Sequence, residues 1–160
     1  MLYQSIFLDN KGKVYSCGYK NALGLGSIYK AYIPTQISIF KYSNGETIDL
    51  NTINIVAISA GFNHSLFLDN TGKVYSCGNN GFGELGHGDT TPRSIPTLIS
   101  NFNDKNGNII SSDNIFIVSI NATFYYSVFV DNKGTVYSYG QLKISRTYIS
   151  PIYNLNNVVT

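Results

Sequence analysis

The sequence predicts an all-β protein of the β-propeller type, with about three blades that are each an antiparallel four-stranded sheet. The first observation is a hairpin pattern, two β-rich runs joined by an Asp-Asn-x-Gly tip, which begins at Asp9, Asp69 and Asp131. These aspartates lie 60 and 62 positions apart, and self-similarity at a nearly fixed period is the signature of a repeat architecture. The second observation is that each unit holds about four short β segments separated by turn residues, which is typical of a propeller blade. A sustained 3.6-residue apolar period, which would predict a long helix, is missing.

The middle unit is the most regular of the three. An apolar run at 55–58 leads into a Gly-x-x-His-Ser turn. Two β-rich runs within 65–77 flank a polar tip that contains glycine, which predicts an antiparallel hairpin. A glycine-rich loop at 78–88 closes the pattern. Residues 95–99 are the predicted outer strand, where Pro96 is tolerated because an edge strand need not donate every ladder hydrogen bond.

We interpret the chain as a single repeat domain, 1–160, with units at approximately 1–54, 55–114 and 115–160. The first unit begins in mid-blade, because Met1 falls where Gly61 lies in the middle unit. Residues 157–160 resemble 54–57, the start of the strand that the first unit lacks. The two ends could therefore complete one another's blade. Since closed propellers have about 4–8 blades, we expect the chain to associate with itself, as a two-copy ring of about six blades, or with another chain. The alternative is that these residues belong to a longer propeller.

The third unit is the most divergent. Tyr126 stands where the middle unit has His64, and the glycine loop is missing after Gly140. Residues 149–152 are the predicted outer strand of this unit.

Two insertions follow the outer strands, at 40–54 and 102–114. Both carry Asn-Gly flanked by alternating apolar residues, which is a strong hairpin signal. They are the best candidates for partner-contacting elements, because function tends to lie on loops held by a rigid scaffold. Coverage of an exposed sheet edge is the alternative. The candidate contact residues are Asn44, Glu46, His87, Asp89, Arg93, Asp104 and Lys105, with His87 expected in an exposed loop.

The middle unit also resembles a known family. Residues 58–68, ISAGFNHSLFL, resemble the signature of the regulator of chromosome condensation repeat, and residues 75–88, YSCGNNGFGELGHG, resemble its second hallmark. The resemblance implies four-stranded blades, usually seven in a closed ring, but no particular activity, because one fold serves many partners. The positions that carry the repeat signature are Gly18, Gly26, Gly61, His64, Gly78, Gly83, Gly86, Pro96 and Gly140. We expect His64 to make a structural hydrogen bond, and Gly61 and Gly78 to have positive φ angles.

Catalysis and cofactor binding are not expected. Residues 81–86 match the dinucleotide fingerprint G-x-G-x-x-G, but the helix-breaking residues 87–92 follow where the fingerprint needs a helix. Two histidines and two cysteines without ligand spacing predict no metal site. Cys17 and Cys77 occupy equivalent positions of successive units, too far apart for a disulfide, and are expected to be reduced.

Composition and charge also bear on which partners and which cellular location are expected. The net charge is +2 and only 12% of residues are charged, so a nucleic-acid surface, which needs clustered Lys and Arg, is not favoured. Without a secretory signal or a long apolar run, an intracellular protein, cytoplasmic, nuclear or packaged in a virus particle, is expected. The abundance of Asn, Ile, Tyr and Lys suggests an AT-rich genome, such as that of a protist or a large DNA virus.

The leading hypothesis is a non-enzymatic scaffold that binds a protein partner. The alternatives are a guanine nucleotide exchange factor-like regulator of a small GTPase, which the family resemblance suggests, and a chromatin or nucleic-acid-associated protein.

Overall fold

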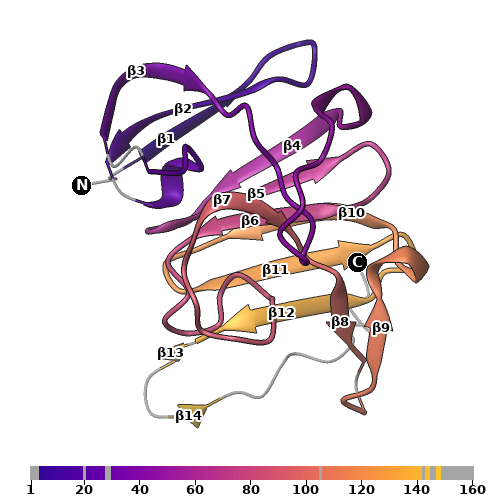
Figure 1. The fold of residues 1–160 in the computed structure, drawn as a ribbon. Helices are drawn as coiled ribbons and strands as arrows, with labels where there is room; N and C mark the ends of the chain where they lie inside the picture. Colours follow the sequence, from indigo (N-terminus) through magenta and orange to yellow (C-terminus); the bar gives the residue numbers. More distant parts are fainter. Residues whose placement is uncertain are drawn as a thin grey trace, which may run out of the picture.

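The computed structural model describes residues 4–19, 21–27, 30–104, 106–141, 143–144 and 147–148. Three antiparallel sheets follow one another in chain order (Figure 1). The first sheet consists of β1 (Gln4–Leu8), β2 (Val14–Tyr19) and β3 (Lys30–Gln36). The middle sheet consists of β4 (Ile55–Ala60), β5 (His64–Asp69), β6 (Val74–Gly78) and β7 (Arg93–Leu98). The third consists of β10 (Ile117–Ala122), β11 (Tyr126–Asp131) and β12 (Val136–Gly140). The expected all-β architecture of propeller-type blades is confirmed. Among the described residues the middle sheet has the expected four strands, whereas the first and third sheets have three each.

Smaller elements lie between and after these strands. They are the hairpin β8 (Asn101–Asn103) and β9 (Ile109–Ser111), the pair β13 (Lys143–Ile144) and β14 (Thr147–Tyr148), and the 3-10 turns η1 (Asn21–Leu23), η2 (Leu50–Thr52) and η3 (Ser112–Asn114). Helices of the described part of the chain are too short to cross a membrane. The predicted strand at 149–152, the strand-like tail at 157–160 and Lys105 lie outside the described residues.

One aspartate fixes the tip of each repeated hairpin. Oδ1 of Asp69 accepts hydrogen bonds from the backbone N–H groups two and four residues further on, at 2.8 and 3.0 Å. Its Oδ2 accepts a hydrogen bond from the hydroxyl of Tyr75 at 3.1 Å. Asp9 and Asp131 make the same three contacts in the first and third sheets. The locked tips give the three hairpins the same register, with the last pairs Leu8↔Val14, Leu68↔Val74 and Val130↔Val136.

Each sheet has an aliphatic face and an aromatic face, because side chains alternate along a strand. The aliphatic faces are Ile6, Leu8 and Val14 in the first sheet, Leu66, Leu68 and Val74 in the middle sheet, and Val128, Val130 and Val136 in the third. The aromatic faces are Phe7, Tyr15 and Cys17, then Phe67, Tyr75 and Cys77, then Phe129, Tyr137 and Tyr139. The aliphatic face of each of the first two sheets packs against the aromatic face of the next sheet. Cys17 and Cys77 are both free thiols, as the sequence predicts.

A phenylalanine from each insertion completes these two interfaces. The ring of Phe40 meets Phe67 edge to face, with 5.7 Å between the ring centroids, and Tyr75 at 5.3 Å. Phe102 makes the equivalent contacts with the third sheet. Such pairs contribute about 0.5–1.5 kcal/mol beyond the area they bury. The insertions are therefore anchored in the core between neighbouring sheets.

The two insertions differ beyond this anchor. The second forms the expected hairpin, β8–β9. The first has only one antiparallel bridge, between Lys41 and Thr47, and forms no pair of strands. The expected hairpin is present but shorter: the N–H of Ile48 donates to the carbonyl of Phe40 and the N–H of Tyr42 to that of Glu46, both at 2.9 Å. The backbone of Lys41 also pairs with the edge of β7, where it bonds Pro96 and Leu98 at 2.9 and 2.8 Å. The first insertion covers a sheet edge, while the second is free to project.

A polar chain also links successive sheets. Nε2 of Gln4 donates to Oγ of Ser65 at 3.1 Å, and that hydroxyl donates to a carbonyl of η1 at 2.9 Å. One unit later, Nε2 of His64 lies 3.0 Å from Oγ of Ser127, which donates to the carbonyl of Glu84. Because the single hydroxyl proton goes to the carbonyl, Nε2 of His64 must donate. Burial lowers the pKa of His64 to about 4, so the ring is neutral at pH 7.

Glycines allow the close contacts at the ends of these strands. Gly78 has φ of +118°, and a Cβ there would lie 2.3 Å from the carbonyl oxygen of Asn63. The expectation of a positive φ is wrong for Gly61, whose constraint is crowding: a Cβ would lie 2.3 Å from the carbonyl oxygen of Thr123. The other signature glycines, Gly18, Gly26, Gly83, Gly86 and Gly140, all have positive φ.

Candidate functional site

The β8–β9 hairpin extends beside the third sheet (Figure 1). Its base is fixed by Phe102, which is only 2% exposed. Its tip is fixed by Asp104, whose carboxylate accepts two backbone N–H groups and the side-chain amide of Asn108, all at 2.8 Å. These hydrogen bonds lower the pKa of Asp104, and the bond from the side chain of Asn108 has the largest effect. On this frame Ile109 is 72% exposed. The hairpin thus presents an apolar side chain in a fixed position.

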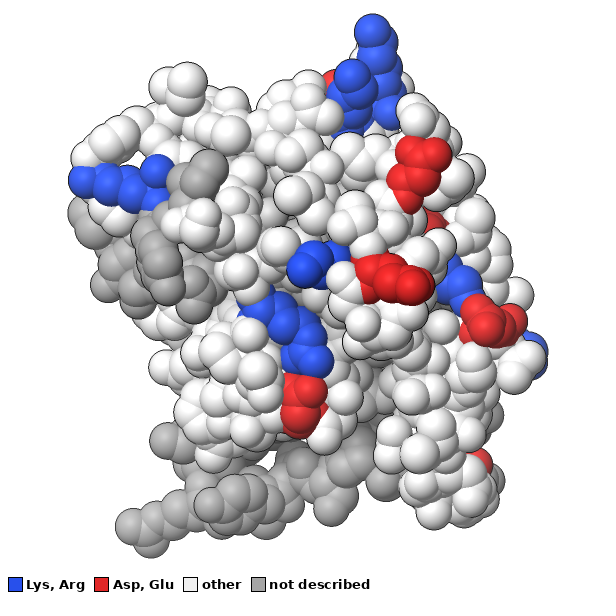
Figure 2. All heavy atoms as spheres, viewed as in Figure 1, with Lys and Arg blue, Asp and Glu red and all other residues white. Residues whose placement is uncertain are grey.

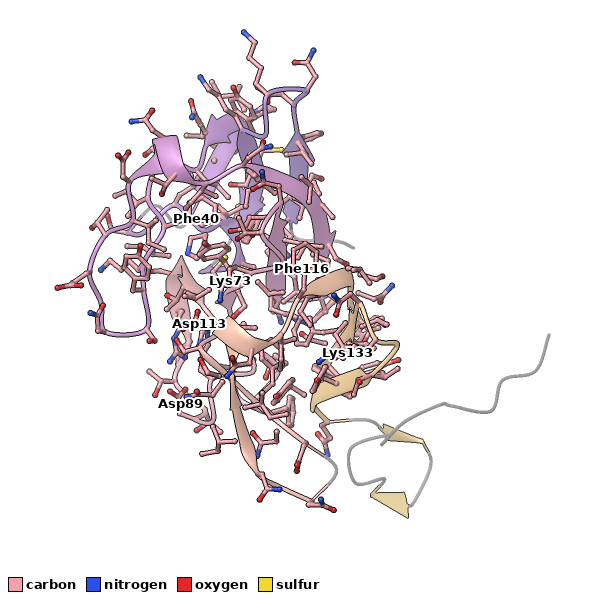
Figure 3. The ribbon with its side chains drawn as sticks, turned by 90° about the vertical axis from the view of Figure 1, so that its right-hand side faces the viewer. Phe40, Lys73, Asp89, Asp113, Phe116 and Lys133 are labelled. Carbon is pink, nitrogen blue, oxygen red and sulfur yellow. The ribbon has the colours of Figure 1, made fainter. Side chains whose placement is uncertain are left out.

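A surface ion pair ties the hairpin to the middle sheet. Asp113 in η3, directly after β9, lies against Nζ of Lys73 at the tip between β5 and β6 (Figure 3). The contact lowers the pKa of Asp113. Because the carboxylate is largely exposed, we assign the pair a positioning role and only a small contribution to stability.

A hollow of about 430 Å³, here the loop hollow, lies between the hairpin and the glycine loop that follows β6. Its lining includes His87, Asp89, Arg93, Ile109 and Tyr139. The guanidinium of Arg93 donates to both carboxylate oxygens of Asp89, at 3.0 and 2.8 Å, and thereby lowers the pKa of Asp89. This bidentate pair neutralises both charges within the hollow.

His87 is not in an exposed position, and that expectation is corrected here. The glycine loop folds back over β6, so that Nε2 of His87 lies 2.9 Å from Oγ of Ser76 and the ring is partly buried. Ser76 donates its own proton to the carbonyl of Leu85 at 2.8 Å, so Nε2 of His87 must be the donor and Nδ1 keeps a lone pair. Burial, followed by the charge of Arg93, lowers the pKa of His87 to about 4. His87 is therefore a neutral ring in the lining of the hollow.

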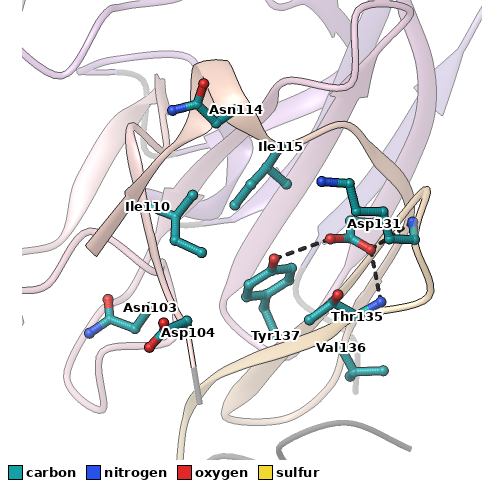
Figure 4. Close-up of a pocket in the computed structure, with 10 residues that line it drawn as sticks. Asn103, Asp104, Ile110, Asn114, Ile115, Asp131, Thr135, Val136 and Tyr137 are labelled. Carbon is teal, nitrogen blue, oxygen red and sulfur yellow. Dashed lines mark hydrogen bonds between the residues drawn. The ribbon is translucent and has the colours of Figure 1, made fainter. Parts of the chain in front are cut away.

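A second hollow, here the tip hollow, measures about 410 Å³ and lies between the hairpin and the tip of the third sheet (Figure 4). Ile110 and Ile115 form its apolar wall, and Asp104, Asp131 and Tyr137 supply polar groups. Figure 4 shows the hydroxyl of Tyr137 directed at Asp131, to which it donates at 3.2 Å. Burial, together with the charge of Asp131, raises the pKa of Tyr137 to about 12.

The titratable groups named in the two hollows are hydrogen-bonded within the chain. Tyr137 remains protonated at neutral pH. Among the described residues, no group of three or more His, Cys, Asp or Glu side chains could hold a metal ion. What the hollows offer is apolar surface bordered by hydrogen-bonding groups, which suits the docking of another molecule.

The sequence-predicted contact residues are divided between these places. His87, Asp89 and Arg93 line the loop hollow, and Asp104 lines the tip hollow. Asn44 and Glu46 are not among the lining residues of either hollow; they lie in the exposed turn of the first insertion, where their side chains bond one another at 2.8 Å. The sequence interpretation missed Tyr139, whose hydroxyl accepts the backbone N–H of Asn103 at 3.1 Å, and Ile109. The alternation of apolar and polar residues around Asn106-Gly107 was the available signal for Ile109.

A second surface feature, also missed, is a cluster of aromatic rings in the turns that precede β5 and β11 and in the glycine loop. Phe62 stacks on Phe124 with 5.0 Å between the ring centroids, and Phe82 meets Tyr125 at 5.0 Å. Phe82 and Phe124 are exposed. These positions belong to separate turns, so no local pattern brings them together.

Charges are interspersed over the face that carries the hairpin. Figure 2 shows Lys and Arg groups next to Asp and Glu groups, without a continuous patch of either sign in that view. The face is therefore not an extended basic surface.

Comparison with protein-family models gives a clear assignment. The model described as the regulator of chromosome condensation (RCC1) repeat matches residues 11–68 and 71–113, and a second model of the same description matches residues 55–84. The chain belongs to this repeat family. The matched segments include the middle unit and most of the first, where the sequence resemblance is strongest.

Individual relatives agree with the assignment. The chain is 32% identical over 144 residues to a bifunctional serine/threonine-protein kinase/NEDD4-like E3 ubiquitin-protein ligase of Dictyostelium discoideum, with 85% of the chain and 7% of the relative covered. It is 35% identical over 101 residues to the human regulator of chromosome condensation, with 61% and 22% covered. The crystal structure of Prp20p from Saccharomyces cerevisiae matches 88% of the chain and 29% of its own length, with a TM-score of 0.62 and 25% identity. The chain thus spans less than a third of each of these proteins.

Proposed function

We propose that the chain is a non-enzymatic, intracellular protein-interaction module whose docking surface is the β8–β9 hairpin with the two hollows beside it. The observation that carries this proposal is Ile109, 72% exposed on a hairpin whose base is buried in the core. An apolar centre with a polar rim is the usual anatomy of a protein–protein interface.

The charges around the hairpin favour a protein over a nucleic acid as the partner. Asp104 and Asp131 line the tip hollow together with Lys133, and Asp113 is paired with Lys73. The described residues around the hairpin therefore lack the clustered Lys and Arg of a nucleic-acid surface. Arg93, the cation of the loop hollow, is already paired with Asp89. Proteins also bind relatives of this chain, since the Prp20p structure was described together with binding to Gsp1p and histones.

The test uses Gsp1p and core histones as probes. Wild-type protein immobilised on a biosensor is compared with Ile109→Asp, and with Tyr32→Asp as a control at an equally exposed site, 76%, on the first sheet. We expect Ile109→Asp to weaken binding at least about tenfold, because a central apolar contact is lost, and Tyr32→Asp to leave it unchanged. Equal binding by both variants would contradict the proposed surface.

The exchange-factor alternative has its own measurement. Release of a fluorescent guanine nucleotide from Gsp1p is followed with and without the chain. Acceleration that Ile109→Asp abolishes would favour a regulator of a small GTPase, whereas binding without acceleration would favour a scaffold.

A further inference from the structure

The β8–β9 hairpin has backbone groups that its two strands do not use between themselves. Near the tip, the N–H of Asp104 donates to the carbonyl of Asn108 at 2.9 Å. At the base, the N–H of Ser112 donates to the carbonyl of Ser100 at 2.7 Å. In an antiparallel ladder such hydrogen-bonded pairs alternate with pairs whose backbone groups point away from the partner strand. Two residues of β9 therefore direct their backbone groups outward.

These two residues are Ile109 and Ser111, which pair with β8 without hydrogen bonds. The N–H and C=O of Ile109 and the N–H of Ser111 have no hydrogen-bond partner among the described residues. The corresponding edge of β8 is engaged, because the N–H of Asn103 donates to the hydroxyl of Tyr139 in β12. In Figure 1, β8 lies between β12 and β9. The unpaired groups thus lie on the edge of β9 opposite β8.

The structure already contains an extended segment that pairs with a strand edge. The N–H of Lys41 donates to the carbonyl of Pro96 in β7, and the carbonyl of Lys41 accepts the N–H of Leu98, at 2.9 and 2.8 Å. This pairing uses one residue whose N–H and C=O point to the same side. Ile109 offers the same pair of groups, and unpaired groups of this kind are a template for the addition of a strand.

We propose that the outer edge of β9 binds an extended peptide segment of a partner protein as an additional strand. The inference rests on the proposed function, since it assigns a binding mode to the same hairpin. Hydrogen bonds to the backbone of Ile109 and Ser111 supply affinity. The exposed side chain of Ile109 borders the loop hollow and contacts an apolar residue of the segment. The recognised segment is short, because β9 ends where Ser111 caps η3.

Ser111→Pro removes a donor of this edge and leaves Ile109 unchanged. Proline has no N–H, and it fits this position because the φ angle of Ser111 is −59° and its N–H points away from β8. Ser111→Ala is the matched control: it keeps the N–H and, like the proline variant, removes the hydroxyl that accepts the N–H of Asp113. Near-ultraviolet circular dichroism of the full chain first compares the fold of each variant with that of the wild type.

The probe is a library of random short peptides displayed on phage, selected on the immobilised wild type in the presence of excess soluble Ser111→Pro protein. An enriched peptide should bind the wild type and Ser111→Ala equally, and Ser111→Pro at least about tenfold more weakly, because a hydrogen bond is lost. On the wild type, which needs no folded variant, the peptide should slow hydrogen exchange of the backbone amides of Ile109 and Ser111.

Several results would overturn the inference. They are the absence of any enriched peptide, binding that Ser111→Ala weakens as much as Ser111→Pro, and unchanged amide exchange at Ile109. A wild-type dimer that Ser111→Pro dissociates would also overturn it, because a second copy would then occupy the edge.

Failure of the proposed function gives a different result. If Gsp1p and core histones bind Ile109→Asp as tightly as the wild type while the peptide still depends on Ser111, the edge binds peptides and the hairpin is not the site of those two proteins. If Ile109→Asp weakens their binding and the peptide criteria fail, the hairpin surface stands and strand addition is wrong.

Discussion

The first and middle sheets have nearly the same sequence pattern and different environments. Every residue of β5 and β6 is buried, whereas β1 alternates between exposed and covered positions. Both hairpins have the same tip and the same register. The comparison teaches that the repeat pattern determines how a sheet pairs within itself, and that the neighbouring sheets determine how much of it contributes to stability.

The largest expected effect concerns the phenylalanine at the equivalent position of each sheet, Phe67 in the middle sheet and Phe7 in the first. Phe67→Ala should lower the free energy of unfolding by about 3–5 kcal/mol, because it leaves a cavity between two sheets. Phe7→Ala, at the half-exposed equivalent, should cost less than about 1 kcal/mol. Urea denaturation of both variants gives the comparison. Equal losses would mean that Phe7 is as well packed as Phe67.

The next effect concerns the strand end of the middle sheet. Gly78→Ala should cost about 2–3 kcal/mol, because a positive φ and a backbone contact both oppose the new Cβ. Gly107→Ala on the hairpin is the control, since its φ is +83° but nothing lies within 4 Å of the new atom. Its cost should stay near 1 kcal/mol. Thermal unfolding measures both, and an unchanged melting temperature for Gly78→Ala would contradict the steric account.

Much of this arrangement could be predicted from the sequence. The Asp-x-x-Gly tips and the alternating runs determine strands, register and repeat period, because these depend on local hydrogen bonds and on side-chain alternation. The burial of His87 could not be predicted, because it depends on a hydroxyl eleven residues earlier in β6. The difference between the two insertions could not be predicted either, because the backbone of Lys41 pairs with β7, which belongs to the next unit. The crowding at Gly61 likewise comes from a carbonyl of the third unit.

The middle sheet should also carry acid sensitivity that the first sheet lacks. His64 and His87 have a pKa of about 4 in the folded chain, below the usual 6.5. The unfolded chain therefore binds more protons between pH 6.5 and 4, so stability is fully present above pH 6.5 and falls as the pH drops through this window. Each histidine should cost about 2 kcal/mol between pH 7 and 5.

His64→Gln sharpens this prediction, because the first sheet already has Gln4 at that position with the same donor role. The variant should keep most of its stability at pH 7.5 and lose about half of the acid sensitivity. Urea denaturation at pH 7.5 and pH 5 measures the difference. A pH dependence identical to that of the wild type would show that His64 does not titrate in this range.

The smallest effect is expected at the tyrosine that closes each hairpin tip. The hydroxyl of Tyr75 is buried, and burial together with the charge of Asp69 raises its pKa far above the usual value. Tyr75→Phe removes this donor and leaves a buried carboxylate oxygen with one partner fewer, which should cost about 1–2 kcal/mol. In the first sheet the corresponding hydroxyl of Tyr15 lies 3.4 Å from Asp9 in a less buried setting, so water can replace it. Tyr15→Phe should therefore change the free energy of unfolding by less than about 0.5 kcal/mol. Both variants keep the ring, so their difference isolates the hydroxyl. Equal effects in the two sheets would mean that the tip hydrogen bond has the same strength regardless of a neighbouring sheet, against the dependence on neighbours inferred above.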